Sequence, residues 1–139
     1  MSIAQHLPAL QVVITLISAP IAVLVRRTGP AFVLVTAASW AAFACAIALW
    51  LATRDGTAIS YAMGSWPPPW GIEYRVDRLS ALVLLIVSGT AAITLPYCRA
   101  SIEREIPREQ HYLFFAMFAL CLTGLLGITM TGDAFNIFV

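Results

Sequence analysis

Lysine is absent from this 139-residue sequence, and charged residues of all kinds make up only 11% of it. Soluble domains typically carry about 25% charged residues, so this chain has too little charge for a surface that faces water. Its eight basic residues, all arginine, nearly balance seven acidic ones to a net charge of +1, which leaves no basic face to neutralise the phosphates of a nucleic acid. The sequence therefore argues against nucleic acid as a partner. Its 60% hydrophobic content and mean hydropathy of +0.87 indicate lipid as the surrounding solvent.

Cysteine is scarce as well, and Cys45, Cys98 and Cys121 are odd in number and widely spaced. Such spacing forms neither a disulfide framework nor a metal-ligand motif, so we expect small apolar packing residues. Serine, histidine and aspartate occur without the spacing of a nucleophile and its base, and no glycine-rich loop could cradle a phosphate. We therefore expect no catalytic residues, no metal and no cofactor, in a chain that is not an enzyme.

Four uncharged stretches are long enough to cross a bilayer. They comprise residues 7–25, 31–52, 79–97 and 112–130, and none contains Asp, Glu, Lys or Arg. As helices, these stretches would be roughly 28 to 33 Å long, which matches the hydrocarbon thickness of about 30 Å. Helices are favoured because every backbone polar group in lipid needs a partner within its own segment. The sequence thus predicts an all-α membrane protein, in which residues 1–139 form one transmembrane region of about four helices.

Arginine placement predicts the direction of the spans. Arg26 and Arg27 directly follow the first stretch, whereas the leader before it holds no basic residue except His6, which favours a retained anchor over a cleaved signal peptide. Because arginine is enriched on the cytoplasmic side, the N-terminus is expected outside. Residues 53–78 then form an outer loop and residues 98–111 an inner loop. We expect a multi-pass protein of the bacterial inner membrane.

The outer loop contains a pattern that is typical of a strand. Apolar and charged residues alternate from Ile72 to Asp77, a period of two that indicates a short, half-buried strand. Residues 57–64 could pair with it, so we predict an outer β-hairpin with its apex near 67–69. Asp77 directly precedes the third stretch, where its carboxylate could cap the first helical turn or, alternatively, bind an ion.

Small residues recur at helical spacing in two of the stretches. Ala38, Ala42 and Ala46 are four residues apart, and Gly124 and Gly127 lie in the fourth stretch. Helices in lipid associate where small side chains let their backbones approach closely. We therefore expect both sets to face neighbouring helices.

The inner loop mixes arginines with glutamates, which is typical of a solvated connection or of a surface for a neighbouring subunit. Pro107 argues against one continuous helix through residues 98–111. His111 ends this loop. It could take part in proton transfer or could simply be solvated.

A pump or antiporter needs ionisable groups inside the membrane, and the four stretches contain none. The nearest is Asp133, just beyond the fourth stretch. An apolar run restarts after Asn136, so residues 134–139 are interpreted as the start of a fifth helix. Because an exposed apolar tail would have no packing partner, we expect that a fifth helix has been lost or that another chain covers this end.

Two motifs resemble a known family. The closing stretch TGDAFNIFV, residues 131–139, resembles the junction between the fourth and fifth helices of the antiporter-like proteins shared by Mrp-type cation/proton antiporters and respiratory complex I. The stretch WPPPWGIEYRVDRLSALVLL, residues 66–85, is similar to the outer hairpin and third-helix entry of the same group, and most of all to the D subunit of Mrp-type sodium/proton antiporters. The resemblance covers nearly the whole chain but only about the first third of a family member.

This resemblance implies about fourteen helices in a complete member, with two inverted repeats that conduct protons along a polar axis in the membrane. The key glutamate of the family lies on the fifth helix, and it is absent here, as are the broken helix with its lysine and the second repeat. Asp133 and Asn136 match the family motif. The family pattern makes them supports of the helix junction rather than carriers of the proton.

Three functions remain open. The first is the N-terminal portion of a subunit of a multisubunit Na⁺/proton antiporter, which contributes to translocation of protons and monovalent cations only with the missing helices or partner subunits. The second is the same portion of a proton-pumping subunit of a complex I type NADH-quinone oxidoreductase. The third is an accessory membrane protein that transports nothing. All three predict the lipid bilayer and other membrane subunits as partners.

Overall fold

Four helices and a small antiparallel hairpin make up the part of the chain that the computed structural model describes, residues 3–66 and 71–132. The helices are α1 (Ile3–Val25), α2 (Thr28–Ala52), α3 (Arg78–Glu105) and α4 (His111–Met130). The strands are β1 (Ile59–Ala62) and β2 (Glu73–Val76), and short 3-10 turns are η1 (Met63–Ser65) and η2 (Arg108–Gln110). The predicted apex at 67–69, the predicted helix start at 134–139, and the candidates Asp133 and Asn136 lie outside the described residues.

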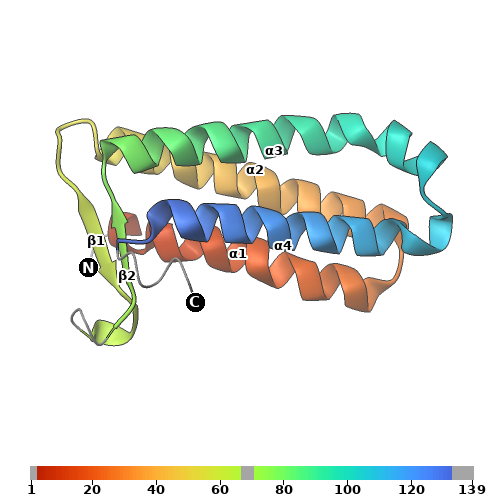
Figure 1. Cartoon of the computed structure of the whole chain (residues 1–139), viewed down its shortest axis with the longest axis horizontal. Coiled ribbons are helices and arrows are strands. Elements are labelled where there is room, and N and C mark those ends of the chain that lie inside the picture. The colour runs from red at the N-terminus through yellow and green to blue at the C-terminus, as the bar shows by residue number, and fades with distance from the viewer. Residues whose placement is uncertain (1–2, 67–70, 133–139) are drawn as a thin grey trace.

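The four helices lie side by side along one direction, as Figure 1 shows. α1 packs against α2 and α4, and α2 also packs against α3. The hairpin lies at one end of the bundle, and the α1–α2 and α3–α4 connections lie at the other (Figure 1). We call these the hairpin end and the arginine end, the latter for Arg26, Arg27, Arg99, Arg104 and Arg108. All four helices are long and apolar enough to cross a membrane. The predicted fold class, an all-α membrane bundle with a short β-hairpin, is confirmed.

The hairpin pairs the two segments that the alternating pattern indicated. Ile59 lies opposite Val76 and Tyr61 opposite Tyr74 in an antiparallel register. Val76 is fully buried against the bundle, whereas Arg75 beside it is exposed. The period of two therefore has a direct cause, because one face of β2 covers the helix ends and the other faces outward.

Large apolar side chains cover the outside of the bundle, the reverse of a water-soluble protein. Leu24 is 82% exposed, Met117 70% and Ile93 68%. Lipid tails are as apolar as these side chains, so nothing drives them inward, and close packing of small residues stabilises the helix pairs instead.

The alanines of α2 occupy the interior, as their spacing indicated. Ala42 and Ala46 are completely buried, and Ala38 is nearly so. Gly124 and Gly127 make no such contact with the described residues, because a Cβ atom at either position would meet nothing within 4 Å, and their expected packing stays a prediction. α4 turns a different face to its neighbours, through Phe115, Ala116, Ala119, Leu122, Leu126 and Met130. Of the cysteines, Cys45 is buried and Cys121 is exposed.

The third helix is longer than its apolar run. It continues beyond Tyr97 to Glu105, so much of the expected inner loop at 98–111 is helical. Ile102 is buried along this extension, and an ion pair between Arg99 and Glu103, 3.0 Å from Nε to Oε1, spans one of its turns. The helix ends where Pro107 forces the preceding residue, Ile106, into the extended region (φ −113°, ψ 136°).

Candidate functional site

The polar side chains buried inside the described part of the bundle are hydroxyls, one amide and one imidazole. They are Gln11, Thr15, Ser18, Ser39, Thr53, Ser88, His111 and Thr123. The hydroxyl groups among them donate to carbonyl oxygens of their own helix, for example Ser88 to Leu84 at 2.6 Å and Thr123 to Ala119 at 2.7 Å. Such bonds satisfy the hydroxyls without linking one helix to the next. No carboxylate or guanidinium is buried among the described residues.

Gln11 is the exception that links two helices, and sequence reasoning missed it. Its side chain is fully buried, and Nε2 donates to the backbone oxygen of Ala42 at 3.1 Å, so α1 is tied to α2. The signal was present, since an amide inside an uncharged apolar run has to find a partner in the protein.

At the hairpin end, Asp77 caps α3. Its carboxylate accepts from the Ser80 backbone N–H at 2.7 Å, and this bond is the main reason that the pKa of Asp77 lies below its ordinary value. The carboxylate is thus used in holding the first turn of α3. No group of three His, Cys, Asp or Glu residues that could hold a metal ion occurs in the described ranges.

Replacing Asp77 by alanine is expected to lower the free energy of unfolding by about 0.5 to 1 kcal/mol, because the cap is lost but its charge is exposed to water. The folded-state pKa is depressed, so the carboxylate contributes fully above its ordinary value of 3.8 and loses this contribution as the pH falls through the lower, folded value. Thermal unfolding in detergent at neutral and acid pH measures both effects. The exposed Asp55→Ala variant is the control, and equal losses from the two variants would contradict the capping role.

The two motifs that carry the family resemblance meet at this end. Thr131 forms a β-bridge with Tyr74, and the Gly132 N–H donates to the Glu73 oxygen at 3.1 Å. A Cβ atom on Gly132 would lie 3.0 Å from the Cβ of Arg75, so glycine permits the close approach. The chain that leads to Asp133 is therefore held against β2, while Asp133 itself lies outside the described residues.

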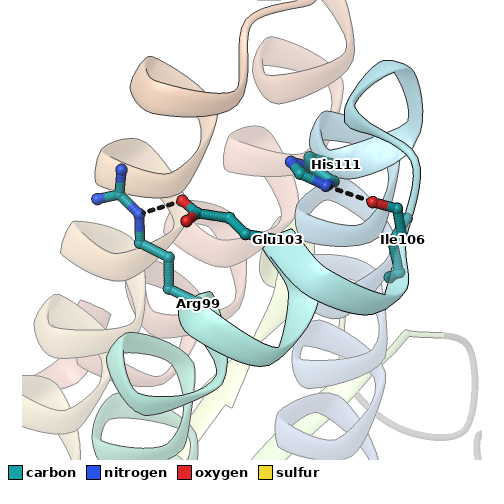
Figure 2. A network of polar contacts seen from close by, with 4 residues as sticks. All are labelled: Arg99, Glu103, Ile106 and His111. Atoms are coloured by element: carbon teal, nitrogen blue, oxygen red, sulfur yellow. Dashed lines mark hydrogen bonds and ion pairs between the residues drawn. The ribbon is translucent and has the colours of Figure 1, made fainter.

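At the arginine end, His111 begins α4 and is buried, with 2% of its surface exposed. Its Nε2 lies 2.7 Å from the Ile106 oxygen, as Figure 2 shows beside the Arg99–Glu103 pair. The interpretation of His111 as a simply solvated residue is therefore wrong. Sequence alone could not show this, because Ile106, whose oxygen contacts the ring, directly follows the extension of α3 that hydropathy does not predict.

Comparison with known proteins identifies several relatives, although no family model matches the chain. The chain is 39% identical over 137 residues to the N subunit of NADH-quinone oxidoreductase from Desulforudis audaxviator, covering 96% of this chain and 27% of that protein. It is 43% identical over 79 residues to the D subunit of a probable K⁺/H⁺ antiporter from Rhizobium meliloti, covering 57% of this chain and 14% of that protein. The chain thus spans about a quarter or less of the length of these relatives.

Solved structures show the same fold. The Mrp complex from a Dietzia species matches with a TM-score of 0.85 and 25% identity, over 99% of this chain and 25% of that one. A membrane-bound sulfane sulfur reductase, an archaeal respiratory membrane complex, matches in fold with a TM-score of 0.84 and 21% identity, over 96% of this chain and 27% of that one. With its four apolar helices, the chain is a multi-pass membrane protein. It is a homologue of the antiporter-like membrane subunits found in Mrp-type cation/proton antiporters and NADH-quinone oxidoreductase, and the share of each relative that it covers fits one part of such a subunit.

Proposed function

We propose that the chain is the N-terminal, four-helix portion of a membrane subunit of a multisubunit Na⁺/proton antiporter. It contributes to translocation only with further helices or partner subunits, and it is not itself an enzyme. Relatives named as D subunits of antiporters and the similarity to an Mrp complex support this assignment.

The observation that carries the proposal is that the described part of the bundle buries no carboxylate or guanidinium group. Proton and cation pathways use ionisable groups that face one another or water inside the membrane. The described part of the chain buries none except His111, which lies at one end of the bundle and is hydrogen-bonded to Ile106. The role that remains is structural: the bundle holds the hairpin, with Thr131 and Gly132 against it, in place for the conducting helices.

The proposed orientation places the arginine end in the cytoplasm of a bacterium and the hairpin outside. The connections at the arginine end are short, and five arginines lie in them or in the last two turns of α3, whereas Arg54, Arg75 and Arg78 belong to the longer hairpin side. Short loops rich in arginine are retained in the cytoplasm, which favours an N-terminus outside.

A second candidate is the corresponding portion of a proton-pumping subunit of a complex I type oxidoreductase. The match to the oxidoreductase N subunit extends over 96% of the chain, whereas the antiporter match extends over 57%. The longer alignment favours this candidate, and the antiporter assignment rests on the higher identity of 43% and on the repeated matches to antiporter subunits.

The isolated chain in liposomes is expected to show no proton flux driven by a sodium or potassium gradient, because its described part buries no carboxylate or guanidinium, and its buried histidine, His111, lies at one end of the bundle. A pH-sensitive dye inside the liposomes measures the flux, with empty liposomes as the control. Flux clearly above the empty liposomes would overturn the proposed dependence on further helices.

Two chimaeras separate the candidates. In one, the chain replaces the matching part of the Rhizobium meliloti antiporter protein; in the other, it replaces that of the Desulforudis audaxviator oxidoreductase protein. We expect antiport in everted vesicles from the first chimaera and no restored redox-driven proton pumping from the second. The reverse result would favour the oxidoreductase. Failure of both, while each unmodified parent protein works in its own assembly, would favour a non-transporting accessory protein.

A further inference from the structure

A polar cavity of about 520 Å³ opens at the arginine end of the bundle. Three helices and the short turn η2 contribute to its walls. It is lined by Thr28, Gly29, Arg99, Glu103, Arg104, Arg108 and His111. Neither the proposed transport role nor the capping at the hairpin end uses this cavity.

The cavity carries an excess of positive charge. Three arginines line it against one glutamate, and that glutamate is already paired with Arg99 at 3.0 Å. Arg99 is further held by Phe32, whose ring centre lies 4.7 Å from the guanidinium carbon. Arg104 and Arg108 form no ion pair within residues 3–66 and 71–132. Their charges therefore remain available for an anion.

Two further features point toward the same anion. Thr28 and Gly29 are the first residues of the 25-residue helix α2, and Arg27 at its N-cap supplies no side-chain hydrogen bond to the free backbone N–H groups. Such a helix start attracts negative charge. His111 supplies a buried polar group: one ring nitrogen bonds to Ile106, and the other lies on the side of the ring that faces Arg99 and Glu103 (Figure 2).

We propose that this cavity binds the phosphate group of an anionic lipid, with Arg104 and Arg108 as its main ligands. The bundle surface beside the cavity favours a lipid over free phosphate. Tyr97, 86% exposed, lies seven residues before Arg104 on α3 and therefore on the same face of that helix, and Ile93, 68% exposed, lies about one turn further from the arginine end. Acyl chains can lie along these apolar side chains while the headgroup reaches the arginines.

The test uses the full chain in detergent, incubated with equal amounts of phosphatidylglycerol and phosphatidylcholine, with native mass spectrometry to count retained lipids. We expect about tenfold more phosphatidylglycerol than phosphatidylcholine on the wild-type chain. The Arg104→Gln/Arg108→Gln double variant is expected to lose this preference. Both side chains are exposed, so the fold should survive, and circular dichroism verifies it. The charge-matched control is Arg54→Gln/Arg75→Gln at the hairpin end, which should retain the preference.

Three results would overturn the proposal. Equal retention of the two lipids by the wild-type chain would show that no phosphate headgroup is selected. An unchanged preference in the Arg104/Arg108 double variant, or an equal loss in the hairpin-end control, would remove the cavity as the site. Displacement of the bound lipid by inorganic phosphate at matched concentration would assign the cavity to a soluble anion. Little displacement is expected, because inorganic phosphate lacks the acyl chains.

Discussion

Replacing Ala42 by leucine is expected to destabilise the folded chain by about 2 to 3 kcal/mol. Ala42 is completely buried on α2, and its backbone oxygen accepts the hydrogen bond from Gln11 of α1. A leucine side chain has no space at this contact, so α1 and α2 would have to move apart. The same displacement would break the hydrogen bond from Nε2 of Gln11 to Ala42. Because Oε1 of Gln11 has no hydrogen-bond partner in the folded chain, both polar atoms of this buried side chain would then lack one.

Thermal unfolding in detergent micelles, followed by circular dichroism, measures this effect. Ala37→Leu is the matched control, because Ala37 lies on the same helix but is exposed. Its larger side chain would face lipid, so we expect a change within about 0.5 kcal/mol. Similar losses from both variants would mean that α2 does not pack through the face of Ala42.

The positions of the four helices could be predicted because a single physical requirement dominates them. A segment that crosses lipid must be uncharged and about twenty residues long, and both properties are visible in the sequence. The hairpin was predictable for a similar reason, since alternation from Ile72 to Val76 reflects one buried face. The cap at Asp77 follows from its place directly before the third apolar run.

The end of α3 could not be predicted from hydropathy. Apolar character stops near Tyr97, where lipid would end, but backbone hydrogen bonding continues into water until Pro107 interrupts it. The pairing of Arg99 with Glu103 and the burial of Ile102 favour this continuation. Hydropathy indicates which part of a helix lies in lipid, whereas capping residues and prolines determine where the helix begins and ends.

Contacts between distant residues explain the remaining differences. The rotation of each helix about its axis decides which of its glycines contact a neighbouring helix. A Cβ atom added to Gly89 would lie 3.0 Å from Cε2 of Phe43, so this glycine is packed against α2. A Cβ atom added to Gly124 would meet none of the described residues within 4 Å. The hydrogen bond of Gln11 to Ala42 and the burial of His111 likewise depend on neighbours far away in the sequence. The sequence shows that these residues are small or polar, but their contact partners depend on how the helices are arranged in the bundle.

Replacing Phe115 by alanine is expected to cost about 2 to 3 kcal/mol, somewhat less than a phenylalanine in the core of a soluble protein. Phe115 is 1% exposed on α4, and its ring packs edge-on against that of Phe32, with ring centres 5.5 Å apart. In lipid the removed ring loses no hydrophobic transfer energy, so only the cavity and the lost van der Waals contacts count.

Met117→Ala tests this reasoning, because Met117 is 70% exposed on the same helix and its loss leaves a space that lipid fills. We expect its unfolding temperature in detergent to stay near that of the wild type. If Met117→Ala were as damaging as Phe115→Ala, the outer surface of α4 would be packed against protein rather than lipid.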